Sequence, residues 1–232
     1  MPNPEILIVE DERVIRVGLK ATLETCGFAV RQARDGEDAL GKIAERRPDL
    51  VLLDVLMPRM NGFRCCEEIR KRDALLPVVF LTANDSECNQ VRAFDLGCDG
   101  FVSKAASEML LVSCIRRAID RSKESRKRIE QSSNLSAVRV GPVVVDLRFL
   151  SVIENDCKIA TLTKTEADIL VLLNEKRGEL VLVDDIISGL RGQGFVCETT
   201  LVYSHISHLR RKLGRAAGLI SNVRGIGYCL LR

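Results

Sequence analysis

The first 121 residues alternate between two periodicities, and this alternation constrains the fold more than any other feature of the chain. Short apolar runs occur at 5–9, 28–32, 50–53, 77–81 and 100–103. Apolar residues at helical spacing follow them, at about 12–26, 36–46, 61–72, 85–95 and 106–121. Strands made of apolar runs are buried on both faces, and strands that alternate with helices form a parallel sheet. The sequence therefore predicts an α/β doubly wound domain with a five-stranded parallel sheet over residues 1–121.

Residues 138–232 have a different pattern, which predicts a second domain of the α+β class. Short strands around turn signals come first, and helical patterns follow at about 162–178, 184–190 and 198–214. The first of these helices begins with the capping box Thr163-x-x-Glu166. Two strands around an Arg-Gly-x-Gly turn end the sequence and predict a hairpin. Three helices with such a hairpin are typical of a winged helix-turn-helix domain.

Between the two domains lies a charged segment, residues 122–137. Ile129 is its only large apolar residue before Leu135, so the segment cannot bury a face of its own. We interpret it as a linker. An extension of the preceding helix is the alternative, because Lys, Glu, Arg and Gln are good helix formers.

Charge is distributed unevenly along the chain. Residues 1–121 contain 18 Lys and Arg against 20 Asp and Glu, a net charge of −2, whereas residues 122–232 contain 17 against 12, a net charge of +5. A basic bias confined to the second half favours a polyanion partner for that half. By itself this signal is weak.

The nine cysteines are scattered, and no two of them have the C-x-x-C spacing of a structural zinc site. Most lie in apolar surroundings, where a free cysteine behaves as a small hydrophobic residue. We therefore expect buried or incidental thiols rather than disulfides or metal ligands.

The N-terminal segment has only a five-residue apolar run with an acidic cluster after it, and no later apolar run approaches about 18 residues. We expect neither a signal peptide nor a membrane span, and hence a cytoplasmic protein without a membrane partner.

Polar residues whose side chains could take part in catalysis or ligand binding follow four of the five predicted strands. They are Glu10 and Asp11, Asp54, Thr82 and Lys104, after the first, third, fourth and fifth strands. Loops at the carboxyl ends of the strands form the ligand crevice of an open parallel sheet, so we expect these side chains to converge.

Three carboxylates repel one another and are stable together mainly when a hard cation binds among them. Oxygen ligands with room for water suit Mg²⁺ or Mn²⁺. A hydroxyl and an ammonium group nearby could hold a small oxyanion attached to one acid. The set therefore predicts phosphoryl transfer to a carboxylate, with Asp54 as the nucleophile and with Lys104 and Thr82 binding the phosphoryl oxygens.

Each of these residues has a simpler interpretation when it is taken alone. A single Asp after a strand is usually a turn or helix cap, and a lone Lys is usually solvated. The occurrence of all five residues at the ends of the right strands favours the chemical interpretation.

Four stretches, "ILIVEDE", "VLLDVLMPRMNGF", "VVFLTAN" and "GFVSKA", together resemble the flavodoxin-like receiver domain of two-component response regulators. The resemblance covers essentially residues 4–121. It implies that Asp54 accepts a phosphoryl group from a cognate sensor histidine kinase or a small phosphodonor. It also implies that Glu10 and Asp11 form the acidic pair, that Asp11 binds Mg²⁺ directly, and that the backbone carbonyl of Leu56 completes the metal site.

Thr82 and Phe101 match the switch pair of that family. A phosphoryl group adds about −1.5 to −2 charge and three acceptor oxygens. Thr82 would move inward to bond one oxygen, and Phe101 would turn into the vacated space. Phe101 could equally be an ordinary core residue, although its place three residues before Lys104 favours the switch.

This sequence departs from the receiver pattern in two places. Relatives usually have a proline after the lysine, with a cis bond, whereas this chain has Ala105. A non-proline cis bond costs about 3 kcal/mol, so we expect a trans or rearranged loop, which leaves open whether Lys104 still reaches Asp54.

The second departure concerns dimerisation. Related proteins often pair charged residues across a receiver homodimer, and this chain retains Arg92 and Asp99. Other positions of that face carry Gly100, Leu110 and Cys114. We expect a homodimer through the receiver domain whose salt bridges are weakened or replaced by a more apolar contact.

The helix at 198–214 has a basic outer face. Val202, Ile206, Leu209 and Leu213 mark its buried side. At about 100° per residue, the opposite side and its flanks carry Thr200, Ser204, Ser207, His208, Arg210 and Arg211. Small hydroxyls, imidazole and guanidinium groups suit a DNA major groove, although a solvated basic helix would have a similar composition.

The terminal hairpin favours the DNA interpretation, because Arg224 lies at the tip of a narrow turn that can reach a minor groove or phosphates. The stretch from "LTKTEADILVLL" to "VRGIGY" resembles the OmpR/PhoB-type winged-helix effector over about residues 138–232. The resemblance maps family DNA contacts onto His208, Arg210, Asn222 and Arg224. His208, commonly arginine in relatives, implies a different base preference, and Tyr228 is expected to pack the wing.

These features predict a transcriptional response regulator that is switched at Asp54 and binds repeated double-stranded DNA half-sites as a dimer, with RNA polymerase as a candidate further partner. We expect no turnover enzyme beyond autophosphorylation and slow autodephosphorylation. One alternative is a phosphatase with a strand-end Asp, but the general acid expected two residues later is Leu56 here. The other is a phosphorylation-independent regulator with a vestigial receiver site.

Overall fold

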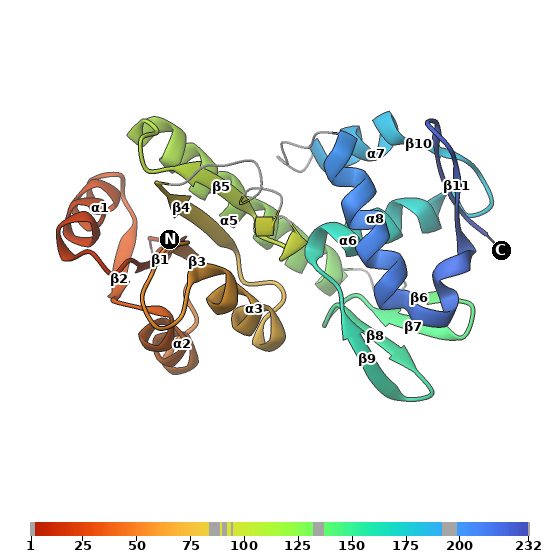
Figure 1. The fold of residues 1–232 in the computed structure, drawn as a ribbon, viewed down its shortest axis with the longest axis horizontal. Coiled ribbons are helices and arrows are strands. Elements are labelled where there is room, and N and C mark those ends of the chain that lie inside the picture. The colour runs from red at the N-terminus through yellow and green to blue at the C-terminus, as the bar shows by residue number, and fades with distance from the viewer. Residues whose placement is uncertain are drawn as a thin grey trace. The chain divides into compact units, whose positions relative to one another are not determined.

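A computed structural model describes residues 3–83, 89, 92–93, 95–131, 137–191 and 199–231. It describes no side chains for 125–131, 191 or 199–201. The chain divides into two compact units, Met1–Ser122 and Lys123–Arg232 (Figure 1).

The first unit contains a five-stranded sheet in which all strand pairs are parallel. The strands are β1 (Glu5–Val9), β2 (Ala29–Ala33), β3 (Leu50–Asp54), β4 (Val78–Thr82) and β5 (Gly100–Ser103). Their order, β2-β1-β3-β4-β5, changes direction between β1 and β3, and sheets of this kind bind ligands at the carboxyl ends of the strands beside such a point. The predicted doubly wound fold is confirmed.

Helices cover both faces of this sheet. They are α1 (Arg13–Thr25), α2 (Gly36–Glu45), α3 (Gly62–Arg72) and α5 (Glu108–Gln131). Helices α2 and α3 pack on one core cluster, to which they contribute Leu40, Phe63 and Ile69. Helices α1 and α5 contribute Leu23, Ile115 and Ile119 to the cluster on the other face. Successive residues of β1 and β3 alternate between the two clusters, as strand geometry requires. The helix expected at 85–95 falls largely outside the described residues.

Helix α5 is longer than the sequence pattern suggested. We expected it to end near residue 121, but it continues to Gln131, well into the segment interpreted as a linker. The alternative of a helical extension is therefore correct for residues 122–131. The reason is local, since this stretch lacks Gly and Pro and is rich in Lys, Glu, Arg and Gln.

The second unit begins with a four-stranded antiparallel sheet, ordered β6-β7-β8-β9. Its strands are β6 (Ala137–Val140), β7 (Val143–Asp146), β8 (Ser151–Glu154) and β9 (Cys157–Thr161). Three helices follow: α6 (Lys164–Glu175), α7 (Val183–Arg191) and α8 (Thr199–Leu213). A second sheet, ordered β10-β12-β11, joins β10 (Val181–Leu182) to the hairpin of β11 (Ile220–Val223) and β12 (Gly227–Leu230). The expected winged helix-turn-helix arrangement is confirmed.

An ion pair between a buried carboxylate and a partly exposed ammonium joins α6 to α8. Thr163 and Glu166 form the predicted capping box, in which the Glu166 backbone N–H donates to Thr163 Oγ1 at 3.2 Å and the Thr163 N–H donates to Glu166 Oε2 at 2.7 Å. Glu166 is fully buried, and Lys212 Nζ of α8 lies 2.9 and 2.7 Å from its two carboxylate oxygens. One carboxylate therefore caps α6 and holds α8.

The seven described cysteines are free thiols, as expected. Cys65, Cys66 and Cys98 are buried in the sheet core, and burial raises the pKa of Cys65 to about 12 and that of Cys66 to about 11. Cys88 and Cys197 lie outside the described residues. Within the described ranges, no helix combines the length and the apolar character that a membrane span requires.

Replacing Lys212 with methionine should destabilise the second unit, because it leaves the Glu166 carboxylate buried without its cation. We expect Lys212→Met to lower the free energy of unfolding by about 3 kcal/mol, measured by urea denaturation of the full chain. Lys176→Met is the control, since Lys176 lies 3.9 Å from Asp185 at an exposed site. It should change stability by less than about 0.5 kcal/mol, and equal effects of the two variants would contradict the assigned role of Glu166.

Candidate functional site

The parallel sheet brings the predicted polar residues to one edge. Asp54 is the last residue of β3 and Thr82 the last of β4, while Glu10 directly follows β1 and Lys104 directly follows β5. The Lys104 backbone N–H donates to the Thr82 carbonyl at 2.8 Å, which continues the pairing of β4 and β5 up to the site.

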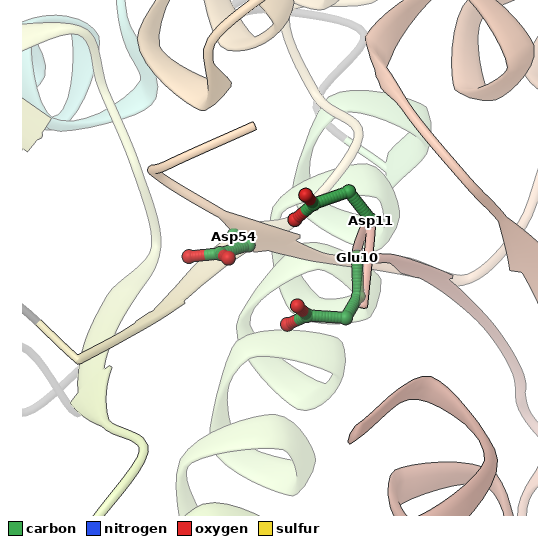
Figure 2. A group of neighbouring side chains, drawn as sticks. All are labelled: Glu10, Asp11 and Asp54. Carbon is green, nitrogen blue, oxygen red and sulfur yellow. The ribbon is translucent and has the colours of Figure 1, made fainter. Parts of the chain in front are cut away.

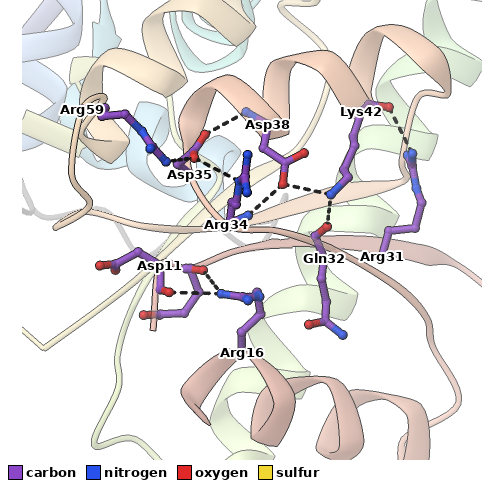
Figure 3. A network of polar contacts seen from close by, with 10 residues as sticks. Asp11, Arg16, Arg31, Gln32, Arg34, Asp35, Asp38, Lys42 and Arg59 are labelled. Atoms are coloured by element: carbon purple, nitrogen blue, oxygen red, sulfur yellow. Dashed lines mark hydrogen bonds and ion pairs between the residues drawn. The ribbon is translucent and has the colours of Figure 1, made fainter. Parts of the chain in front are cut away.

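Three carboxylates meet at this edge, as Figure 2 shows. One oxygen each of Glu10, Asp11 and Asp54 lies within 4.8 Å of the others. Glu10 and Asp54 are buried, with 2% and 4% of their surface exposed, whereas Asp11 is exposed. The guanidinium of Arg16 in α1 donates to the Glu10 and Asp11 carbonyls, at 2.7 and 3.2 Å, and fixes the loop that carries them (Figure 3).

Lys104 binds two of these acids at once. Its ammonium lies 2.8 Å from Asp54 Oδ2 and 2.7 Å from Glu10 Oε2. Burial alone would lower the pKa of Lys104, but its hydrogen bonds to Asp54 and Glu10 raise it above the ordinary value. Burial raises the pKa of Glu10; the hydrogen bond from Lys104 opposes this rise and the charge of Asp54 adds to it. No cis peptide bond occurs in the part of the chain that the structure describes, so the bond before Ala105 is trans as expected, and Lys104 still reaches Asp54.

The donor set fits a hard divalent cation, because three carboxylates share one small region and no soft ligand is among them. Glu10, Asp11 and Asp54 are the residues that could hold Mg²⁺ or Mn²⁺. The Leu56 backbone N–H donates to Asp54 Oδ1 at 3.3 Å, which orients that carboxylate. The predicted role of the Leu56 carbonyl stays a prediction.

The backbone of Gly62 packs closely against the backbone of Asp54 and Val55. Gly62 begins α3, and its N–H donates to the Val55 carbonyl at 2.9 Å. A Cβ atom on Gly62 would lie 2.1 Å from the Asp54 carbonyl oxygen, so only glycine permits this approach. The sequence reasoning missed this role of Gly62, although its place after Asn61, the cap of α3, offers a signal.

The predicted switch residues are Thr82, the last residue of β4, and Phe101 in β5. Thr82 is fully buried, and Phe101 is half-buried against the core, with its ring 6.4 Å from the ring of Phe80. This placement is compatible with both interpretations of Phe101, so its role in a switch stays a prediction.

Residues of the expected dimer face have partners within the first unit. Asp99 is partly buried, and its carboxylate accepts from the Arg70 guanidinium and the Val78 N–H, both at 3.0 Å. The guanidinium of Arg92 lies over the Phe63 ring at 4.5 Å. A Cβ atom on Gly100 would lie 2.6 Å from Cys114 Sγ, so these two positions pack against each other, while Leu110 is exposed.

Helix α8 has the predicted amphipathic character. Val202, Ile206, Leu209 and Leu213 are buried, each with at most 1% of its surface exposed. Ser207 and Arg211 are exposed, and Ser204, His208 and Arg210 are partly exposed. The side chain of Thr200 lies outside the described part of the structure.

Arg210 has a structural contact that the sequence did not suggest. Its Nε and Nη2 donate to the Ile220 carbonyl, at 3.0 and 2.5 Å, and its guanidinium lies 5.7 Å from the centre of the Tyr228 ring. Arg210 therefore joins α8 to the hairpin, and Tyr228 is buried in that hairpin as expected.

The hairpin presents the remaining predicted DNA contacts. Asn222 in β11 and Arg224 in the following turn are exposed. Gly225 has φ +76°, a conformation that glycine adopts readily and that makes the turn narrow. A Cβ atom on Gly227 would lie 2.1 Å from the Val181 carbonyl oxygen, so this glycine lets β12 approach β10.

Two family models match the chain, and they correspond to the two units. The response regulator receiver domain matches residues 6–116, and the C-terminal domain of transcriptional regulatory proteins matches residues 158–230. An acidic site on a doubly wound sheet, followed by a winged helix, thus defines a response regulator with a DNA-binding output domain.

Full-length relatives narrow this class. The chain is 31% identical to the alkaline phosphatase synthesis transcriptional regulatory protein PhoP of Bacillus subtilis, over 98% of this chain and 97% of that protein. It is 32% identical to the response regulator MprA of Mycobacterium bovis (97% and 96% covered) and to the transcriptional regulatory protein AfsQ1 of Streptomyces coelicolor (98% and 98% covered). The chain belongs to the OmpR/PhoB family of two-component response regulators, which confirms the resemblance seen in the sequence.

Solved structures support the fold. A RitR mutant matches 98% of this chain and 99% of its own, with a TM-score of 0.77 at 22% identity. A response regulator receiver domain from Clostridium thermocellum matches 52% of this chain and 98% of its own, with a TM-score of 0.50 at 28% identity.

Gly62→Ala should disturb the acidic site through the backbone of Asp54. The added methyl group must displace either α3 or the end of β3, so we expect a loss of about 1–3 kcal/mol in the unfolding free energy of the first unit. Gly41→Ala is the matched control, because a Cβ atom there meets nothing within 4 Å. In the middle of α2 it should raise stability by about 0.5–1 kcal/mol, and thermal melts of both variants test this difference. A neutral Gly62→Ala would contradict the close contact.

Proposed function

We propose that this chain is a DNA-binding transcription regulator whose activity is switched by phosphorylation of Asp54. The observation that carries this proposal is the position of Lys104 Nζ, at hydrogen-bond distance from both Asp54 and Glu10. A buried nucleophilic carboxylate with an ammonium group beside it can accept a phosphoryl group and hold its oxygens.

The chemistry is an in-line transfer. An Asp54 carboxylate oxygen attacks the phosphorus, a new P–O bond forms, and the bond between phosphorus and the donor breaks, with the electron pair leaving on the donor. A cognate sensor histidine kinase or a small phosphodonor supplies the group. The Lys104 ammonium shifts from the Asp54 carboxylate to one phosphoryl oxygen, and the Thr82 hydroxyl donates a hydrogen bond to another.

Mg²⁺ or Mn²⁺, held by Glu10, Asp11 and Asp54 with the Leu56 carbonyl, would neutralise charge on the phosphoryl oxygens. Asp11 is the exposed member of the acidic set, which makes it the first ligand that an entering cation meets. Beyond autophosphorylation and slow hydrolysis of its own aspartyl phosphate, we assign no enzymatic turnover to the chain.

The change at Asp54 reaches the dimer face through Thr82 and Phe101. Asp99 is already bound to Arg70, and Met109 and Leu110 are exposed, with 82% and 56% of their surface accessible. These features support a homodimer with a larger apolar share than salt-bridged receiver dimers have. A dimer would bind two DNA half-sites in the cytoplasm, with RNA polymerase as a further partner.

The DNA surface consists of α8 and the hairpin. Ser204, Ser207, His208 and Arg211 would face the major groove together with Thr200, while Asn222 and Arg224 would contact the backbone or minor groove. Arg210 contributes mainly by joining the two elements, because its guanidinium already donates to the Ile220 carbonyl.

Phosphorylation is tested by intact-mass measurement after incubation with acetyl phosphate and Mg²⁺. We expect a gain of one phosphoryl group, which is lost with Asp54→Asn and on removal of Mg²⁺ with a chelator. Absence of any gain would favour the alternative of a phosphorylation-independent regulator. A gain that persists in Asp54→Asn would place the acceptor elsewhere.

DNA binding is tested with fragments selected from a genomic library. Arg224→Ala should weaken binding to all fragments and reduce the slope of log affinity against log salt by about 1. His208→Ala should relax the preference at one base position, at a cost of about 1–3 kcal/mol. Arg148→Ala is the control. Arg148 lies in the turn between β7 and β8, outside the proposed DNA surface, so its removal takes away the same charge but should change neither the DNA affinity with its salt dependence nor the base preference. Equal effects of Arg148→Ala and Arg224→Ala would contradict the assigned surface.

A further inference from the structure

The loop from Val55 to Asn61 joins the nucleophile to α3, and it is fastened at both ends. At its start, the Leu56 N–H donates to Asp54 Oδ1 at 3.3 Å. At its end, the Gly62 N–H donates to the Val55 carbonyl at 2.9 Å, and Asn61 caps α3. These bonds hold only the two ends of the loop. The contacts of its middle residues therefore also determine how firmly the Leu56 backbone is held against Asp54.

Arg59, in the middle of this loop, has an unusual backbone conformation. Its φ is +66°, in the left-handed region that residues with a side chain adopt only where the surroundings fix them. Its guanidinium forms an ion pair with the Asp35 carboxylate (Figure 3). Asp35 precedes α2 and is far from the loop in sequence, so this contact fastens the loop to a different element.

Asp35 is a firm anchor. Its side chain is 4% exposed, and Oδ1 accepts from the Asp38 N–H at 2.9 Å as the N-cap of α2. Asp38 in turn accepts from the Arg34 N–H at 3.0 Å and lies 2.9 Å from the Lys42 ammonium. These bonds, drawn in Figure 3, hold the start of α2 in one place.

The residue after Arg59 strengthens this attachment. A Cβ atom on Gly36, the first residue of α2, would lie 2.7 Å from Met60 Sδ, so the Met60 side chain lies directly over that glycine. The Met60 N–H also donates to the Pro58 carbonyl at 2.8 Å, which closes a tight turn around Arg59. The loop thus has an ionic and an apolar contact with α2, side by side.

We propose that the Asp35–Arg59 ion pair is a latch that positions the 55–61 loop, and with it the Leu56 backbone, against Asp54. Asp35 and Arg59 are then positioning residues for cation binding and phosphorylation at the acidic site, although neither touches the reacting atoms. This inference concerns how the acidic site of the proposed function is positioned, and it rests on that function.

Simple electrostatics and the latch predict different results. Loss of a positive charge at Arg59 should favour a cation at the nearby acids, whereas loss of a negative charge at Asp35 should disfavour it. A latch predicts the same direction for both losses, because either one releases the loop. Neutralising both residues together restores the net charge but not the latch.

The experiment uses the full chain with Asp35→Asn, Arg59→Gln and the double variant. Asparagine keeps the N-cap of α2, so Asp35→Asn removes the ion pair and leaves the helix start intact. Arg34→Gln is the matched control, since Arg34 also lies beside Asp35, at 3.7 Å, but outside the loop. Mg²⁺ affinity is measured by calorimetric titration, and the exchange rate of the Leu56 amide is measured by NMR without metal.

The latch predicts that each single variant weakens Mg²⁺ binding by about tenfold and speeds exchange of the Leu56 amide. The double variant should resemble the singles, with no additive loss, and Arg34→Gln should match the unaltered chain. Opposite effects of the two single variants, or altered thermal stability with unchanged Mg²⁺ affinity and Leu56 exchange, would overturn the latch alone. An unaltered chain that neither binds Mg²⁺ nor gains a phosphoryl group would overturn the proposed function and the latch with it.

Discussion

The first unit depends on one electrostatic compromise, three carboxylates at the edge of a parallel sheet with a single ammonium between two of them. Glu10 and Asp54 are buried, and their mutual repulsion is offset by Lys104, which lies within 2.8 Å of both. Under the proposed function, the uncompensated negative charge of this site would bind a divalent cation, and the cation together with Lys104 would offset the charge of the phosphoryl group. Because all strand pairs of this sheet are parallel, the carboxyl ends of β1, β3 and β5 lie at the same edge.

The second unit uses charge for a different purpose. Glu166 is removed from solvent so that it can cap α6 and bind Lys212 of α8. Arg210 fastens the other side of α8 to the hairpin through the Ile220 carbonyl. Two charged side chains thereby fix the helix that carries the candidate base contacts, and they leave Ser207, Arg211 and Arg224 exposed.

Periodicity and local signals predicted the strands, the helices of the second unit and the convergence of the acids on one edge, because each of these depends on short-range patterns and on the rule for parallel sheets. Contacts between residues distant in sequence could not be predicted. Nothing near Asp99 in the sequence indicates that Arg70 binds it, and nothing near Arg59 indicates Asp35. The length of α5 was misjudged because a charged segment without an apolar face can still be helical when it continues an existing helix.

The central claim, that Asp54 is the residue that receives the phosphoryl group, is tested most directly by trapping the acyl phosphate. Borohydride reduces an aspartyl phosphate to homoserine, and peptide mass spectrometry then identifies the modified position. After treatment with acetyl phosphate and Mg²⁺, the account predicts homoserine at position 54 and nowhere else. Homoserine at another acidic residue, or none at any position, would contradict it.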